Sequence, residues 1–183
     1  MVEAMTNGGF RKHGRLFLPA DALAPEPVIF SYLKSYVEEI TVLEAEKTYQ
    51  AGNIPFKTSV RHVHPVETYG IVFAPAGVNI GYLSDTRYFD TLAESYAGSN
   101  LLIVNMVLTE PRPSVDHLSV PDVERLIQEI KPQIAILSHF GMHVWQARPW
   151  LIAEDLTQKT GIKVIAARDG MKFDLAQIEE VKK

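Results

Sequence analysis

Four histidines and one aspartate at the ends of apolar segments are the residues of this sequence that could do chemistry. The stretch "RHVHPVETYG" holds His62 and His64, one residue apart. Asp85 follows the apolar segment "NIGYL", His139 follows "QIAILS", and His117 ends the polar segment "TEPRPSVDH". Loops at strand ends of layered α/β proteins are exposed yet held by a rigid sheet, and active sites gather there. We therefore expect the side chains of His64, Asp85, His117 and His139, each at a separate strand or loop end, to converge on one spot.

Imidazole and carboxylate side chains are suited to hold divalent metal ions. One carboxylate can give an oxygen to each of two ions, while neutral imidazoles fill the outer positions. Such ions ionise water near neutral pH for attack on a phosphorus or carbonyl centre. A histidine outside the coordination sphere can protonate the leaving oxygen. The chain has no cysteine, so a thiolate site is excluded; zinc is the expected metal, with manganese or iron as alternatives.

Each of these residues also has an ordinary structural interpretation. A single histidine at a strand end is more often a surface or hydrogen-bonded residue than a metal ligand. Asp85 precedes Thr86 and could cap a turn, and His117 lies two residues before Ser119 in a loop. The residue types and spacings alone leave both the metal site and the structural interpretation open.

Length and composition indicate one folded domain, residues 1–183. Of the residues, 46% are hydrophobic and 22% charged, as is typical of globular chains. The net charge of −4 argues against a broad surface for nucleic acid. The sequence shows neither a secretory leader nor an apolar run long enough to span a bilayer, so we expect a cytoplasmic protein without a membrane partner.

The order of the apolar patterns predicts an α/β (α+β) fold. The segment 27–40 reads as a helix, and 54–62 reads as a strand that ends just before His64. Two further strands, "YGIVFA" and "NIGYLSD", precede the nearly continuous apolar run "NLLIVNMVL", which is typical of a buried strand. Strands then alternate with helices, the first of which has Ser119 as its expected N-cap. Helices covering a mixed sheet follow from this order.

Four motifs in this order resemble a known family. "HPVETYGIVF", "GYLSDTRYF", "DHLS" and "ILSHFG" resemble the C-terminal half of metallo-β-lactamase-fold hydrolases, in the branch that contains tRNase Z and related phosphodiesterases. The resemblance covers about residues 54–175. Four motifs in the right order are fairly specific for the superfamily and weakly specific for any one activity.

The resemblance implies a role for each motif residue. His64 matches a histidine that binds the first metal, and Asp85 matches the aspartate that bridges both metals. His139 matches the late histidine that binds the second metal. His117 matches the histidine that acts as general acid in the tRNase Z branch.

Two further residues are candidates for orienting those ligands through hydrogen bonds. His62 would share a face with His64 if the strand continued through both, although packing is the stronger interpretation. Asp169, in "AARDG", follows the last core strand; a turn role is an equal alternative to supporting a histidine.

The strongest signature of the family, His-x-His-x-Asp-His, is absent from this sequence. "HVHPVE" begins like it but lacks the Asp-His. The resemblance therefore implies a partial αββα sandwich with its N-terminal part missing, in which the chain is the C-terminal two-thirds of the fold. A complete site would hold up to two metals, and this one is expected to be incomplete, with one or none.

The function that the resemblance implies is metal-dependent hydrolysis, of phosphodiesterase type, on RNA or a small molecule. Whether this chain alone is an enzyme stays open at this point. A non-catalytic or truncated protein with a binding or assembly role is one alternative. Thioester or lactone hydrolysis is another, ranked lower because His117 suits protonation of a poor alkoxide leaving group.

A missing part of the sandwich would leave an apolar sheet face uncovered, and large apolar patches mark interfaces. We therefore predict that the chain self-associates as a homo-oligomer, unless an N-terminal segment covers that face. Light scattering of the purified chain checks this, and a monodisperse monomer would contradict it.

Overall fold

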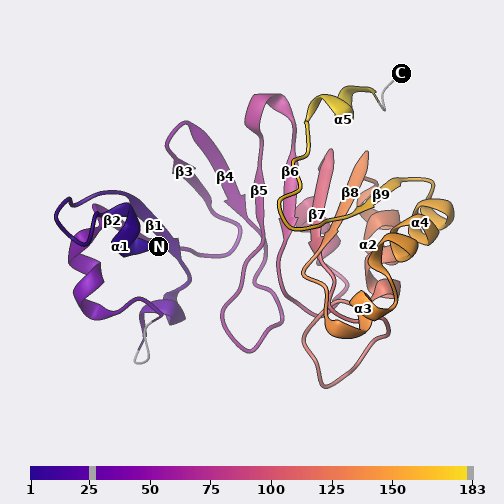
Figure 1. The fold of residues 1–183 in the computed structure, drawn as a ribbon, viewed down its shortest axis with the longest axis horizontal. Coiled ribbons are helices and arrows are strands. Elements are labelled where there is room, and N and C mark those ends of the chain that lie inside the picture. The colour runs from indigo at the N-terminus through magenta and orange to yellow at the C-terminus, as the bar shows by residue number, and fades with distance from the viewer. Residues whose placement is uncertain (25–27, 181–183) are drawn as a thin grey trace.

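A seven-stranded mixed sheet forms the centre of the molecule (Figure 1), as seen in a computed structural model that describes residues 1–24 and 28–180. Neighbouring strands follow the chain order from β3 to β9. The pairs from β3 to β6 are antiparallel and the pairs from β6 to β9 are parallel. The strands are β3 (Thr48–Ala51), β4 (Ile54–Thr58), β5 (Ile71–Phe73), β6 (Ile80–Leu83), β7 (Leu101–Asn105), β8 (Ile134–Ser138) and β9 (Lys163–Ala166).

Helices follow the parallel strands in the second half of the chain. Two amphipathic helices, α2 and α4, pack against each other, and α4 also packs against β9. The α-helices are α1 (Val2–Met5), α2 (Val120–Ile130), α3 (Met142–Gln146), α4 (Pro149–Thr160) and α5 (Ala176–Glu180). Short 3-10 helices are η1 (Ala20–Leu23), η2 (Ser31–Tyr36), η3 (Pro75–Gly77) and η4 (Ala93–Tyr96). The predicted order, with strands first and strand–helix alternation after them, is thus confirmed.

Alternation along the strands divides the core between the two faces of the sheet. Leu102 and Val104 of β7 lie in the larger cluster, with the buried side chains of α2 and α4. Leu101 and Ile103 point to the opposite face, where they belong to a smaller cluster with Ile178 of α5. Successive side chains of a strand leave on opposite faces, so an uninterrupted apolar run is what a strand covered on both sides requires.

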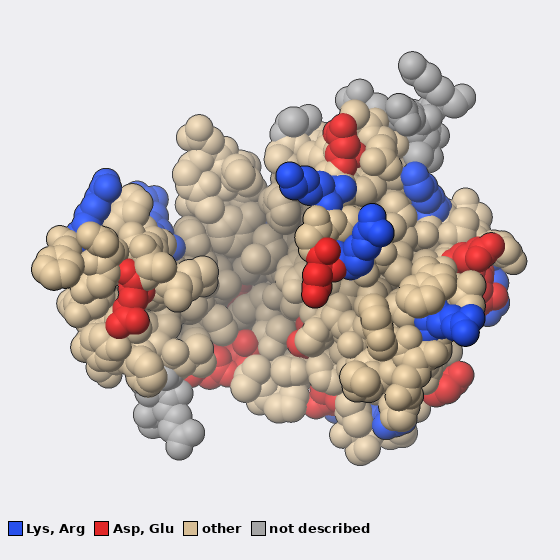
Figure 2. Space-filling view, in the orientation of Figure 1, with Lys and Arg blue, Asp and Glu red and all other residues tan. Residues whose placement is uncertain are grey.

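Residues 1–24 and 28–42 form a lobe beside the β3–β4 edge of the sheet (Figure 1). Its two parallel strands, β1 (Arg15–Leu18) and β2 (Glu39–Val42), make a separate small sheet. The lobe reaches the main sheet through Phe17, whose ring meets that of Phe56 edge to face at 5.1 Å. Figure 2 shows the surface hollowed between this lobe and the rest of the molecule.

The predicted helix over 27–40 is wrong, and residue 27 itself lies outside the described residues. The structure has only the 3-10 helix η2 there, followed by β2. Aromatic and β-branched residues dominate this segment, and these favour extended backbone. The last two residues of the predicted helix, Glu39 and Ile40, instead pair with β1, which lies far away in sequence.

The helix at Ser119 is confirmed, and it fixes the loop that carries His117. The carboxylate of Asp122 accepts hydrogen bonds from the backbone N–H of Ser119 at 2.9 Å and from its hydroxyl at 2.5 Å. This is a capping box, which satisfies donors that a helix start leaves free. Pro121 occupies the first turn, where its missing N–H costs nothing.

In the described part of the chain, no helix has the length and apolar character needed to cross a membrane.

Candidate metal centre

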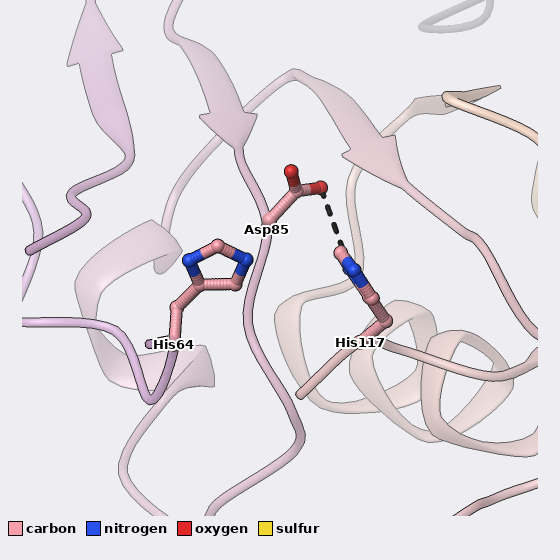
Figure 3. Close-up of side chains that lie close together, drawn as sticks. All are labelled: His64, Asp85 and His117. Carbon is pink, nitrogen blue, oxygen red and sulfur yellow. Dashed lines mark ion pairs between the residues drawn. The ribbon is translucent and has the colours of Figure 1, made fainter. Parts of the chain in front are cut away.

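Three side chains from separate loops meet at one edge of the sheet: His64, Asp85 and His117 (Figure 3). One ligand atom from each lies within 4.8 Å of the others. Nδ1 of His117 is 3.7 Å from Oδ1 of Asp85. The fourth predicted residue joins from the other side, because Nε2 of His139 is 3.4 Å from Oδ2 of Asp85. The structure thus brings together the four residues that the sequence motifs singled out, around one carboxylate.

Asp85 is held in place by a residue that sequence reasoning missed. Nδ2 of Asn105 donates a hydrogen bond to Oδ1 of Asp85 at 2.8 Å. Asn105 ends β7, next to β6, whose last residue lies two positions before Asp85. The available signal was a polar residue within the apolar run "NLLIVNMVL". A buried amide at such a position needs a partner, and Asp85 is that partner.

His64 is brought to Asp85 by a pair of segments that run side by side. The strand predicted over 54–62 is too long, because β4 ends at Thr58. The backbone N–H of Val63 donates to Oγ1 of Thr86 at 3.1 Å, and the backbone N–H of Arg87 donates to the carbonyl of Val63 at 3.1 Å. These bonds align the chain around His64 with the chain around Asp85.

The loop of His117 is anchored at both ends. On one side, Nε of Arg87 lies 3.2 Å from Oδ1 of Asp116. On the other, the carbonyl of Leu118 accepts from the backbone N–H groups of Val107 and Leu108, each at 3.1 Å. An imidazole held between two such anchors has little freedom to turn away from the centre.

His139 stands in an unusual backbone conformation. Its φ is +58°, in the left-handed region that non-glycine residues rarely adopt. It directly follows β8, and two residues later the chain passes the carbonyl of Val107 so closely that a Cβ on Gly141 would overlap it. Such a conformation costs free energy and persists only where the surrounding structure holds it. Conformations of this kind cluster at functional sites.

His62 points away from His64 and into the core, so the two histidines do not share a face. Only 3% of His62 is exposed. Its Nδ1 lies 3.2 Å from the carbonyl of Asp85 and 3.2 Å from Oγ of Ser84, and its Nε2 lies 2.9 Å from the hydroxyl of Tyr96. A carbonyl only accepts, so Nδ1 carries the proton and Nε2 accepts from Tyr96. A Cβ on Gly70 would overlap that hydroxyl, so glycine there leaves the room this contact needs.

Burial keeps His62 neutral. Desolvation lowers the pKa of its imidazole from 6.5 to about 4, against the opposing effect of the hydrogen bond to the Asp85 carbonyl. His62 therefore connects the turn that carries Asp85 to a buried tyrosine, rather than offering a nitrogen to a metal. Asp169 is exposed, and within residues 1–24 and 28–180 it makes no hydrogen bond to a histidine; instead it lines a cavity together with His139.

The donor set fits a divalent cation. Nδ1 of His117 is buried and has no hydrogen-bond partner in the described part of the chain, an arrangement that costs free energy unless something binds it. Imidazole nitrogens of His64 and His139 and the carboxylate of Asp85 complete a set of nitrogen and oxygen ligands, which zinc, manganese and iron all accept.

One family model and one related sequence match most of the chain. Residues 10–140, which contain all four centre residues, match the model of the β-lactamase superfamily domain. An uncharacterised protein of Methanocaldococcus jannaschii is 33% identical over 185 aligned positions, which cover 96% of this chain and 67% of that protein.

Solved structures show the same fold at low sequence identity. The metallo-β-lactamase-fold protein YhfI from Bacillus subtilis aligns with a TM-score of 0.76 and 16% identity, over 93% of this chain and 68% of that one. A diphosphatase of the PhnP family gives 0.69 and 18%, over 94% and 63%. The short form of human tRNase Z gives 0.61 and 12%, over 95% and 73%. The α/β metallo-β-lactamase-like fold with a mixed sheet is thereby confirmed, whereas the expected loss of an N-terminal part stays a prediction.

Replacing His62 with phenylalanine should destabilise the protein. The change keeps an aromatic ring but leaves the Tyr96 hydroxyl and the Asp85 carbonyl without partners, which should cost about 2–4 kcal/mol at neutral pH. The wild type should also lose up to about 3 kcal/mol as pH falls from 6.5 towards 4, because the unfolded chain then binds a proton that the folded chain excludes.

Urea unfolding of chelator-treated protein at several pH values measures both effects. His62→Phe should lack the His62 part of the pH dependence, while the exposed control His13→Asn should follow the wild type. Stability curves that run parallel for the wild type and His62→Phe would contradict the assignment.

Proposed function

The chain belongs to the β-lactamase superfamily, and we propose that it is a metal-dependent hydrolase that acts on phosphodiesters. The observation that carries this proposal is the convergence of three histidines on the carboxylate of Asp85. The chain spans about two thirds of the length of its relative from Methanocaldococcus jannaschii, so the activity of the whole protein is part of the proposal.

Metal binding would fall to residues around Asp85. His64 and His139 both lie close to its carboxylate, and the hydrogen bond from Asn105 fixes one of its two oxygens. When bound there, a divalent cation would supply Lewis-acid polarisation and a water that ionises near neutral pH. Among the described residues, the carboxylate of Asp85 and the imidazoles of His64 and His139 would hold at least one ion, for which zinc is the first choice.

His117 is the proposed general acid. Its imidazole lies between those of His64 and His139, with ring centroids 5.5 Å and 6.3 Å away. Its Nδ1 lies 3.7 Å from Oδ1 of Asp85, and a protonated imidazole at this place could pass its proton to a leaving oxygen. Fixation of its loop by the Arg87–Asp116 ion pair keeps the imidazole at that distance.

A competing role for His117 rests on the same geometry. One of its ring nitrogens is close enough to His64 and Asp85 for His117 to be a third metal ligand. The two roles differ in what the loss of His117 would do: a general acid can be removed without losing the metal, and a ligand cannot.

Phosphodiester chemistry is supported by the relatives' names and by the proposed acid. One structural relative is a diphosphatase and another is tRNase Z. A histidine acid matters most for an alkoxide leaving group, which is too basic to depart without a proton. The negative charge of the chain favours a small substrate over a long RNA.

Metal content tests the centre directly. We expect about one equivalent of zinc per chain after metal loading and removal of excess. Asp85→Asn, which keeps the shape but removes the charge, should lower the affinity by at least about tenfold. Mass spectrometry of the metal in dialysed protein measures this. Asp90→Asn is the control, because Asp90 is exposed and is not one of the candidate metal ligands.

Equal metal affinity of the wild type and Asp85→Asn would contradict the proposal that Asp85 is a metal ligand. A wild-type protein that takes up no metal would contradict the metal centre as a whole. Near two equivalents would mean that further ligands join from outside the described residues.

The acid role predicts a dependence on the leaving group. In metal-loaded protein, His117→Ala should slow hydrolysis of a phosphodiester with an alkyl leaving group by about 100-fold. It should slow bis(p-nitrophenyl) phosphate far less, because nitrophenolate leaves without a proton. Metal content is measured on the same samples, and loss of the metal would instead show that His117 is a ligand. Hydrolysis of thioesters but of neither phosphodiester would contradict the substrate class.

A further inference from the structure

A cavity opens beside the candidate metal centre and leads away from it. It has a volume of about 530 Å³, and its walls include His139, Trp145, Arg168 and Asp169. A second cavity of about 540 Å³ shares Trp145 and Arg168 with the first and extends to Trp150. Volumes of this size suit small organic ligands. Because His139 belongs both to the centre and to the first cavity, a ligand seated here would reach the metal site.

Two exposed tryptophans form one side of this double cavity. Trp145 is 56% exposed and Trp150 is 54% exposed, and their rings meet edge to face at 6.3 Å. The turn that joins α3 to α4 fixes them, since Arg148 adopts a φ of +62° and Pro149 then starts the next helix. Large aromatic rings held open to solvent next to a cavity are a ready surface for stacking a planar group.

The walls of both cavities also include a positively charged side chain, Arg168. Arg168 is exposed, and it makes no ion pair with any residue that the structure describes. A guanidinium binds phosphate oxygens with two parallel hydrogen bonds and also stacks on aromatic faces. Asp169, its neighbour in the same wall, offers acceptor oxygens to hydroxyl or amino groups but opposes a ligand that carries only negative charge.

We propose that this double cavity binds a nucleotide. The base stacks on the face of one of the two indole rings, Trp145 or Trp150, and the other ring meets it edge-on. Arg168 binds a phosphate, and Asp169 accepts hydrogen bonds from the ribose hydroxyls or the base. This makes the substrate class of the centre a small nucleotide phosphodiester; that step rests on the proposed function, whereas nucleotide binding does not.

Other occupants fit the walls less well. An acyl chain or an apolar peptide would use the tryptophans but leave Arg168 and Asp169 without partners beside it. Inorganic phosphate or a sugar phosphate would use Arg168 and leave the two indole rings bare. A second copy of the chain could cover the tryptophans, and the experiment below separates that outcome.

The sequence provides a built-in probe, because Trp145 and Trp150 are its only tryptophans. Tryptophan fluorescence therefore reports on this cavity alone. AMP added to the full chain should quench the fluorescence saturably, whereas ribose 5-phosphate at the same concentration should not. Adenosine should bind more weakly than AMP, since it lacks the phosphate that Arg168 would hold.

Two variants test the two walls. Trp145→Leu should weaken AMP binding by about tenfold, as expected for loss of one stacking surface, with Trp150 still giving a signal. Arg168→Gln should weaken AMP by about tenfold and leave adenosine unchanged. Arg11→Gln, an exposed change in the N-terminal lobe, is the control. Should Trp145→Leu fail to fold, the surface change Arg168→Gln still decides the matter.

The AMP titrations are carried out once in the presence of a metal chelator and once in the presence of zinc. AMP binding without metal uptake would support the cavity and reject the metal centre; metal uptake without AMP binding would do the reverse. Equal quenching by ribose 5-phosphate and AMP would overturn the proposal, as would an Arg168→Gln chain that binds AMP like the wild type. Fluorescence that changes with protein concentration alone would show that copies of the chain cover the tryptophans, which also overturns it.

Discussion

The parallel pairing of β6, β7 and β8 is the constraint on which the centre depends. Leu83 pairs with Val104, which in turn pairs with Leu137, so the three strands end at the same edge of the sheet. All three of these side chains are fully buried, and a shift of register by one residue would turn each to the wrong face. The hydrophobic core therefore sets the positions of Asp85 and His139, although neither belongs to that core.

The strand ends determine where Asp85 lies, and hydrogen bonds from polar side chains then fix its orientation. Asn105 donates a hydrogen bond to the side-chain carboxylate of Asp85, while His62 donates one to the backbone carbonyl of the same residue. Both supporting residues are buried, so their hydrogen bonds are made in a medium of low dielectric constant, where a lost partner is costly. Such partners orient metal ligands and tune them. The centre is thus a rigid carboxylate surrounded by imidazoles on loops.

The proposed nucleotide cavity has a different origin from the centre it adjoins. It lies between the turn from α3 to α4 and the segment after β9, and the side chains proposed to bind the ligand, Trp145, Trp150, Arg168 and Asp169, are exposed. Residues there can change with little effect on the core, whereas those under Asp85 cannot. In such a fold, the residues that would determine substrate specificity lie apart from those that would carry out the reaction, so one fold can support several activities. The varied names of the structural relatives agree with this.

The sequence alone determined the order of strands in the second half of the chain and the identities of the converging residues, because continuous apolar runs and strand-end histidines are local signals. It could not determine the β1–β2 pair, since that strand pairing joins residues far apart and takes in Glu39 and Ile40, which the helical pattern at 27–40 had included. Nor could it separate His62 from His64, because the strand that would have aligned them ends at Thr58. Only the tertiary structure decided that His62 packs under Asp85 while His64 faces it, since hydrogen bonds between distant segments set both directions.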